Sequence, residues 1–354
     1  MTHSLAPRES RLLLPQPPQD LSFEAVPAWA ARQRAQTGAV VCVMHQRAAD
    51  GTHLHWLDSA HARGWIRAAG AHAPAFSSAA LAAYGQEALD SGFVGADAVL
   101  LAFLRHDGEL PRLSWDVAPV FAPARVHAVQ RLDLYAITDH VQRLEQALAA
   151  GVRTVQLRIK RPAQPDAAWQ AGLREALARA IASARAVGGQ CFVNDHWALA
   201  AELRADAVHL GQEDLMALGE DGRHALLASG VALGISSHSV WELCRARALS
   251  PRYIACGPVW PTTTKDMPWV PQGLDNLAWW CRHAGAPVVA IGGILAPDQA
   301  RQAASAGADG VCLVRALGEA PAQVLPAYAQ ALADGRQAPG TAAPPWPHPT
   351  LPVG

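Results

Sequence analysis

The sequence predicts an α/β fold, a closed (β/α)8 TIM barrel, preceded by a small α+β N-terminal domain. From residue 132 onward, short apolar segments alternate with helical segments eight times, the number of units that closes such a barrel. No G-x-G-x-x-G motif follows the first apolar segment, which disfavours an open doubly wound sheet. Polar residues directly follow most of these segments, at the strand ends where barrel enzymes hold their active sites.

Changes in composition predict the domain boundaries. The proline-containing, polar residues 1–22 are expected to form a flexible tail, and residues 23–125 to form the small α+β domain. The barrel is expected to span 126–336, and the Pro-rich residues 337–354 are expected to be disordered. Within the first domain, the proline-containing segment 110–125 is predicted to be a linker to the barrel. The sequence assigns no role to the region before the barrel.

The N-terminal domain contains weaker but interpretable patterns. An apolar run predicts a buried strand at 38–44, and alternation of polar and apolar residues predicts its partner at 53–57. Serines at the start of 77–89 predict a capped helix. Asp97 is expected to cap a further apolar helix at 98–104. These elements are sufficient for a small core, but they include no phosphate-binding loop and no cluster of metal ligands.

Composition limits the classes of function. The formal net charge of −1 argues against a large nucleic-acid surface, which is usually basic. No apolar run reaches the ~20 residues of a membrane span, and no signal peptide is evident, so we expect a cytoplasmic protein without a membrane partner. The six cysteines are scattered and are expected to be reduced, buried thiols, and a histidine-based metal site is disfavoured. A homo-oligomer is left open.

The apolar segments of the barrel are short, as expected for its strands. They are predicted at residues 134–137, 152–157, 190–193, 207–210, 231–235, 253–256, 287–291 and 310–314.

Three polar side chains at the end of the second segment alternate with apolar ones. Gln156, Arg158 and Lys160 are separated by Leu157 and Ile159, so a period of two puts the polar set on one face. Two cations and an amide that point into a barrel mouth are suited to binding a phosphate or a diphosphate.

Two carboxylates follow neighbouring segments. Asp195 follows the third segment next to Asn194, and Asp214 follows the fourth. Magnesium commonly binds one or two protein carboxylates, with water and substrate phosphate oxygens completing its shell. The sequence therefore predicts a Mg²⁺–diphosphate site in which these acids lie beside the cations.

The later segments are followed by groups that suit a second anion. The loop 257–265 places three threonines and Lys265 in consecutive positions, and Ser236 follows the fifth segment. Gly292 and Gly293 follow the seventh segment, and Val314-Arg315 ends the eighth. Loops after the last two strands of this fold commonly bind phosphate through backbone N–H groups, so a monophosphate site is expected there.

Taken in order, these motifs resemble the thiamine phosphate synthase family over about residues 132–335. The matching pieces are Leu-Tyr-x-Ile-Thr-Asp, Val-Gln-Leu-Arg-x-Lys, Asn-Asp, His-Leu-Gly-Gln-Glu-Asp, Gly-x-Ser-x-His-Ser, Gly-Pro-Val-x-Pro-Thr-x-Thr-Lys and Ala-Ile-Gly-Gly-Ile. The N-terminal extension is not part of the common core of that family.

The resemblance implies a reaction between small-molecule substrates. A pyrimidinylmethyl diphosphate ionises, a thiazole ethyl phosphate attacks the carbocation, and thiamine phosphate and diphosphate leave. By position, the resemblance implies that the pyrimidine diphosphate is bound by Gln156, Arg158, Lys160, Asn194 and Lys265, of which Arg158, Lys160 and Lys265 are catalytic. It implies that Mg²⁺ is bound by Asp195 and Asp214. It implies that the thiazole phosphate is bound by Ser236, Thr262, Thr264, Gly292, Gly293, Val314 and Arg315.

Two positions depart from the family pattern. Ile159 stands where the family commonly has Glu, and Arg315 stands where it commonly has Ser. The guanidinium of Arg315 is expected either to add a direct bond to the phosphate or to block the site, and the former is favoured.

Two other functions remain as alternatives. A thiazole tautomerase-like isomerase on the same barrel needs neither a diphosphate nor Mg²⁺, and the retained cations and acids disfavour it. A non-catalytic sensor of phosphate ligands has only Arg315 in its favour.

Overall fold

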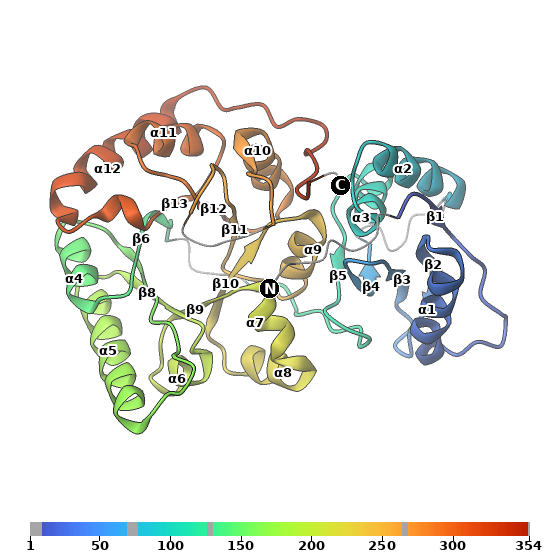
Figure 1. Ribbon diagram of the computed structural model, residues 1–354, viewed down its shortest axis with the longest axis horizontal. Helices are drawn as coiled ribbons and strands as arrows, with labels where there is room; N and C mark the ends of the chain where they lie inside the picture. The colour runs from blue at the N-terminus through green and yellow to red at the C-terminus, as the bar shows by residue number, and fades with distance from the viewer. Residues whose placement is uncertain (1–8, 69–76, 126–129, 264–267, 353–354) are drawn as a thin grey trace.

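The computed structural model describes residues 9–68, 77–125, 130–263 and 268–352. A five-stranded sheet with three α-helices precedes a closed eight-stranded barrel, and the two lie side by side (Figure 1). The predicted fold, a barrel preceded by a small α+β region, is confirmed. Among the described residues, no helix is long and apolar enough to cross a membrane.

The N-terminal sheet has the strand order β1-β2-β3-β4-β5, in which only the β1–β2 pair is parallel. Its strands are β1 (Leu12–Leu13), β2 (Val40–Arg47), β3 (His53–Asp58), β4 (Arg63–Arg67) and β5 (Arg112–Leu113). The sheet therefore takes in two residues from the expected tail and two from the expected linker, while β2 and β3 overlap the two strands that the sequence predicts.

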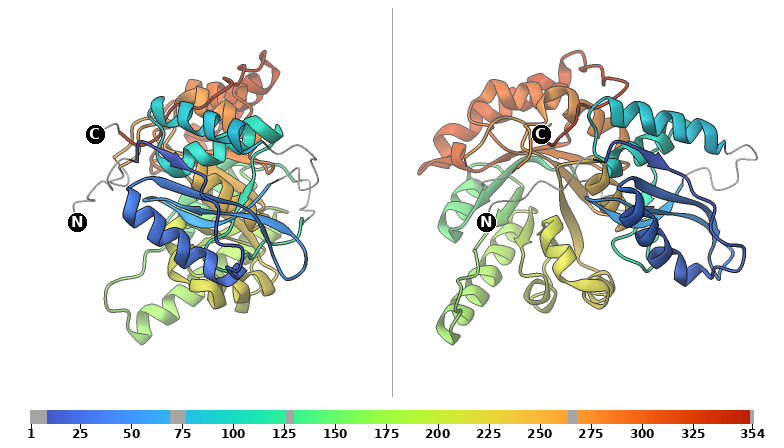
Figure 2. Two further views of the ribbon diagram at one scale, coloured as in Figure 1. Left: turned by 90° about the vertical axis from the view of Figure 1, so that its right-hand side faces the viewer. Right: turned by 45° about the vertical axis from the view of Figure 1, so that its right-hand side comes forward.

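Helices cover both faces of this sheet (Figure 2). After the short 3-10 helix η1 (Phe23–Ala25), α1 (Val26–Thr37) packs on one face, where Val41 and Val43 point. Val40 and Cys42 alternate with them and face the core formed with α2 (Ser78–Asp90) and α3 (Gly95–Asp107).

The barrel is closed by parallel pairing of its last strand with its first. Its strands are β6 (Asp133–Thr138), β7 (Thr154–Leu157), β8 (Gln190–Asn194), β9 (Ala207–Leu210), β10 (Ala232–Ser237), β11 (Tyr253–Cys256), β12 (Val288–Ala290) and β13 (Gly310–Leu313). Each overlaps a predicted apolar segment. Because all eight strands run in one direction, the residues that follow them meet at one end of the barrel.

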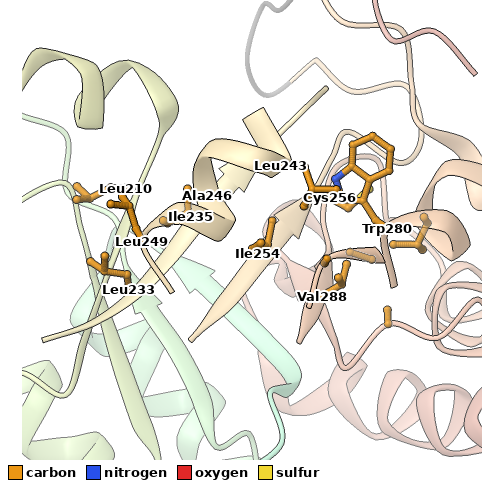
Figure 3. Packing of buried hydrophobic residues seen from close by; sticks show 14 of the residues in the cluster. Leu210, Leu233, Ile235, Leu243, Ala246, Leu249, Ile254, Cys256, Trp280 and Val288 are labelled. Atoms are coloured by element: carbon orange, nitrogen blue, oxygen red, sulfur yellow. The ribbon is translucent and has the colours of Figure 1, made fainter. Parts of the chain in front are cut away.

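Helices surround the barrel and bury its outer surface. They are α4 (Val141–Ala149), α5 (Ala167–Ala186), α6 (Trp197–Glu202), α7 (Gln212–Ala217), α8 (Gly219–Ala228), α9 (Val240–Ala248), α10 (Gly273–His283), α11 (Pro297–Ser305), η2 (Arg315–Leu317) and α12 (Pro321–Gln337). Ile235 and Ile254 on adjacent strands pack outward with Leu243 of α9 and Trp280 of α10 (Figure 3). This apolar layer fixes the strand ends that carry the polar residues.

The two parts of the molecule meet at α9, and we call this contact the junction. The Asp97 carboxylate accepts a hydrogen bond from the Trp241 backbone N–H at 2.8 Å. Trp115 Nε1 donates to the Arg245 carbonyl at 2.9 Å, and Arg245 Nη2 donates to the Arg63 carbonyl at 3.1 Å. The expectation that Asp97 caps its own helix is wrong, because Asp97 lies inside the first turn of α3 and its carboxylate caps α9 instead.

The Pro-rich C-terminal segment follows a defined path across α10 to the N-terminal helices, although its composition predicts disorder (Figure 1). The Val270 N–H donates to the Thr350 carbonyl at 2.9 Å, and His348 Nε2 lies 2.8 Å from the Gln272 carbonyl. The guanidinium of Arg105 lies 5.7 Å from the centre of the Trp346 ring. The C-terminal segment thus contacts the end of the loop that precedes α10. Residues nearer the start of this loop lie where the barrel strands end.

Candidate active site

A cavity of about 360 Å³ opens where the barrel strands end, and we call it the mouth. Every predicted site residue within the described part of the chain lines it. These residues are Gln156, Arg158, Lys160, Asn194, Asp195, Asp214, Ser236, Thr262, Gly292, Gly293, Val314 and Arg315. Thr264 and Lys265 lie outside the described residues.

The predicted cationic group lies at the end of β7. Gln156 is buried on the strand and donates through Nε2 to the Tyr135 hydroxyl at 2.9 Å. Arg158 and Lys160 lie beyond the strand and are more exposed. Lys160 Nζ lies 3.0 Å from Asp195 Oδ2, so one cation and one predicted metal ligand already contact each other.

An amide from β8 adds a donor beside this group. Asn194 is buried, and its Nδ2 atom has no hydrogen-bond partner among the described residues. A buried N–H group that lines a cavity without a partner is costly unless a ligand or water accepts from it. Asn194 is therefore suited to contacting a ligand.

The two predicted metal ligands influence each other. Burial raises the pKa of Asp214, and the negative charge of Asp195 raises it further. One Asp214 oxygen accepts the Gly211 N–H at 3.0 Å. Asp195 has a φ of 64°, a left-handed conformation that is uncommon for residues other than glycine. Such backbone strain is concentrated at functional sites.

The chemistry of these donors fits a magnesium ion. The described residues contain no group of three or more His, Cys, Asp or Glu side chains that could hold a metal. Two neighbouring carboxylates that repel each other are a donor set that Mg²⁺ accepts when substrate phosphate and water supply the rest.

The opposite wall of the mouth contains the glycine pair. Gly292 and Gly293 have φ values of 94° and 72°, which favour glycine. A Cβ on Gly292 would lie 2.6 Å from Pro258 Cα, so there is no room for a side chain. Nearby, Arg315 Nη1 donates to the Thr263 hydroxyl at 3.2 Å. This hydrogen bond links the segment that follows β13 to the loop that follows β11.

A buried polar chain that the sequence did not predict forms the floor of the mouth. The Tyr135 and Tyr253 hydroxyls are 3.0 Å apart, and His209 Nδ1 lies 2.7 Å from the Tyr253 hydroxyl. The other His209 ring nitrogen lies 3.0 Å from Ser236 Oγ. Burial lowers the pKa of His209 to about 4, so the ring is neutral at physiological pH. Alternation along β6 and β9 was the only signal that these side chains point inward.

An aromatic pair on a further wall was also missed. The rings of His238 and Trp269 stack with centroids 5.3 Å apart, and both line the mouth. His238 Nδ1 lies 2.8 Å from a carboxylate oxygen of Glu242. A lone tryptophan in a loop gives no sequence signal for such stacking.

Comparison with known proteins assigns the barrel to a family. The family model described as thiamine monophosphate synthase matches residues 133–317, more than half of the chain. The chain belongs to this family. A thiamine-phosphate synthase from Rhizobium etli is 44% identical over 186 residues, which are 52% of this chain and 86% of that protein. One from Neisseria meningitidis is 43% identical over 207 residues, which are 58% of this chain and 96% of that protein.

A solved structure agrees with this assignment. Thiamine phosphate pyrophosphorylase from Pyrococcus furiosus is 27% identical, with a TM-score of 0.50, and the match covers 58% of this chain and 96% of that one. The resemblance inferred from the motifs is thus confirmed. All residues that line the mouth fall within the region matched by the thiamine monophosphate synthase model, whereas the N-terminal sheet lies outside it.

Proposed function

We propose that the barrel condenses 4-amino-2-methyl-5-pyrimidinylmethyl diphosphate with a methylthiazole ethyl phosphate to give thiamine phosphate and diphosphate, with carbon dioxide as a third product where the thiazole is carboxylated. Synthesis of thiamine phosphate is the activity of the named relatives. The observation that carries the proposal for this chain is the mouth itself, which gathers cations and paired carboxylates on one side and a glycine pair on the other.

The diphosphate is assigned to the first side. Arg158 and Lys160 supply positive charge, and Asn194 supplies a buried amide donor with no internal partner. Charge-assisted hydrogen bonds of this kind are stronger than neutral ones. Lys265 stays a predicted member of this group.

Asp195 and Asp214 would hold Mg²⁺ next to these cations. When bound there, the ion would supply positive charge to the oxygens of the departing diphosphate. The carboxylates themselves position Lys160, which already contacts Asp195 at 3.0 Å.

The thiazole phosphate is assigned to the second side. Consecutive positive φ values at Gly292 and Gly293 are compatible with a backbone concavity that binds anions through N–H groups. Arg315 lies at the same wall and adds a guanidinium, with Val314 beside it. Ser236 and Thr262 line the space between the two sides, and Thr264 stays a predicted contact.

The proposed reaction is a dissociative substitution. The C–O bond to the diphosphate breaks and its electron pair leaves with the diphosphate, whose growing charge Arg158 and Lys160 stabilise. The thiazole nitrogen then donates its lone pair to the pyrimidinylmethyl carbocation and forms the new C–N bond. No proton needs to be removed from that nitrogen, which is consistent with a neutral His209 whose two ring nitrogens are both within hydrogen-bond distance of protein hydroxyls.

The test is direct turnover. Purified full-length protein, both substrates and Mg²⁺ should yield thiamine phosphate and diphosphate in equal amounts, measured by chromatography and a diphosphate assay. Absence of product from folded protein would reject the proposal. In that case, isomerisation of the thiazole without diphosphate would favour a tautomerase-like function, and ligand binding without any conversion would favour a sensor.

A further inference from the structure

A second cavity, of about 450 Å³, lies at the opposite end of the barrel from the mouth. Part of its lining comes from residues that directly precede strands, such as Arg252 before β11, Pro287 before β12 and Asp309 before β13. The remainder includes Arg112 and Arg125 from the region before the barrel. The N-terminal region and the barrel thus build this cavity together, and we call it the junction cavity.

Arginine dominates the polar lining of the junction cavity. Among the described residues of the lining, there are four guanidinium groups and two carboxylates, which leaves an excess of two positive charges. The charged lining residues are Arg112, Arg125, Arg247, Arg252, Glu109 and Asp309. Proteins use arginine in this way where planar donor groups recognise phosphate or carboxylate.

Backbone carbonyls hold each guanidinium in place. The bonds run from Arg112 Nη1 to Ala122 O at 3.1 Å, from Arg125 Nη2 to Leu227 O at 2.8 Å, from Arg247 Nη2 to Leu110 O at 2.9 Å, and from Arg252 Nη2 to Gln130 O. A carbonyl orients a guanidinium without neutralising its charge. Because each guanidinium has five N–H donors, these bonds leave donor capacity for a ligand.

Arg247 is a largely buried arginine of this lining whose hydrogen bonds are incomplete. Its side chain is 9% exposed, and its Nε atom has no acceptor among the described residues. One carboxylate, that of the exposed Glu109, lies 2.9 Å from Nη2. Gly285 lines the same cavity, and a Cβ there would lie only 2.8 Å from Arg247 Nη1, so glycine leaves this guanidinium uncovered.

The arginines also repel one another. Burial lowers the pKa of Arg112, and the positive charges of Arg247 and Arg67 lower it further. A bound anion would relieve this repulsion at the contact between the two parts of the chain.

We propose that the junction cavity binds a small phosphate-bearing anion. A phosphate monoester carries close to two negative charges at neutral pH, which matches the excess positive charge of the lining. The volume exceeds that needed for one phosphate group and lies within the range of small-molecule sites. Bound there, the anion contacts arginines from both parts of the chain and ties the N-terminal sheet to the barrel.

The test uses calorimetric titration of the full-length protein with inorganic phosphate, and separately with glycerol phosphate as a simple phosphomonoester. Arg112→Gln should weaken binding at one site at least about tenfold, the loss expected for one charge-assisted contact. Arg125→Gln should act in the same direction. The matched control is Arg67→Gln, which removes a neighbouring arginine that pairs with Arg112 across β4 and β5 but does not line the cavity.

Two further comparisons separate the possible outcomes. Arg158→Gln alters the mouth and should leave phosphate binding in the junction cavity unchanged. This variant therefore separates binding in the junction cavity from binding and turnover at the mouth. Tighter binding of glycerol phosphate than of inorganic phosphate favours a monoester ligand, and weaker binding of glycerol phosphate favours free phosphate. The proposal is overturned if Arg158→Gln removes all saturable binding, or if Arg112→Gln and Arg125→Gln both bind like Arg67→Gln.

Discussion

The mouth and the junction use charged side chains in opposite ways. At the mouth, Lys160 is exposed and Arg158 is partly exposed, and burial together with the negative charge of Asp195 raises the pKa of Asp214. At the junction, Asp97 is 2% exposed and accepts a backbone N–H from the other part of the molecule. The mouth still has a buried donor, Asn194 Nδ2, with no partner among the described residues, whereas the buried carboxyl group at the junction accepts a hydrogen bond from the fold itself. Substitutions at the mouth should therefore affect turnover more than stability, and substitutions at the junction the reverse.

The largest expected effect concerns the acids of the mouth. Asp195→Asn and Asp214→Asn should each abolish Mg²⁺-dependent turnover, because an amide lacks the negative charge that holds the ion. Asparagine also tolerates the left-handed backbone at position 195. Far-ultraviolet circular dichroism should match the unsubstituted protein, and Asp221→Asn, an exposed acid on α8, serves as the control. Ordinary turnover in either mouth variant would contradict the metal assignment.

A smaller effect is expected at the glycine pair. Gly292→Ala meets Pro258 and imposes a positive φ on alanine, so the KM for the thiazole phosphate should rise about tenfold or more, since the backbone donors move. Gly230→Ala is the matched control, because Gly230 has a φ of 76° with open space around its Cβ position. It shares the backbone strain without the clash. Equal kinetics for the two variants would reject a role of Gly292 in binding the phosphate.

The predicted site residues that the structure describes all line the mouth, because their positions in the sequence follow a local rule. Each predicted group lies at or shortly after the end of an apolar segment, so recognising the segments places Gln156, Asp195 and Asp214 at one end of the barrel. The chain from His209 through Tyr253 to Tyr135 escaped prediction because it joins β9, β11 and β6, which are not neighbours in the barrel. Only the closed geometry of the barrel brings their side chains together.

Elements outside the barrel were harder to predict because tertiary contacts override local preference there. Proline content around Trp346 and His348 indicates disorder, yet both side chains contact other elements. Asp97 has the spacing of a residue that caps its own helix, but burial beside α9 gives its carboxylate a different donor. A local pattern cannot reveal a partner that lies 144 positions further along the chain.

The smallest expected effect tests the charge of Asp97. Burial and, to a smaller extent, the nearby Glu242 together raise the pKa of this carboxyl to about 8, against the opposing effect of the Trp241 N–H. Between the pKa of an unfolded aspartate, about 4, and this value, the folded state binds more protons than the unfolded state, so stability falls as the pH rises.

Asp97→Asn keeps an oxygen that can accept the Trp241 N–H but has no charge to bury. Its unfolding midpoint relative to the unsubstituted protein should therefore increase from pH 5 to pH 8, as measured by thermal denaturation. Asp97→Ala, which removes the acceptor, should be less stable than Asp97→Asn at both values. A pH-independent difference between Asp97→Asn and the unsubstituted protein would show that Asp97 stabilises the junction without a shifted pKa.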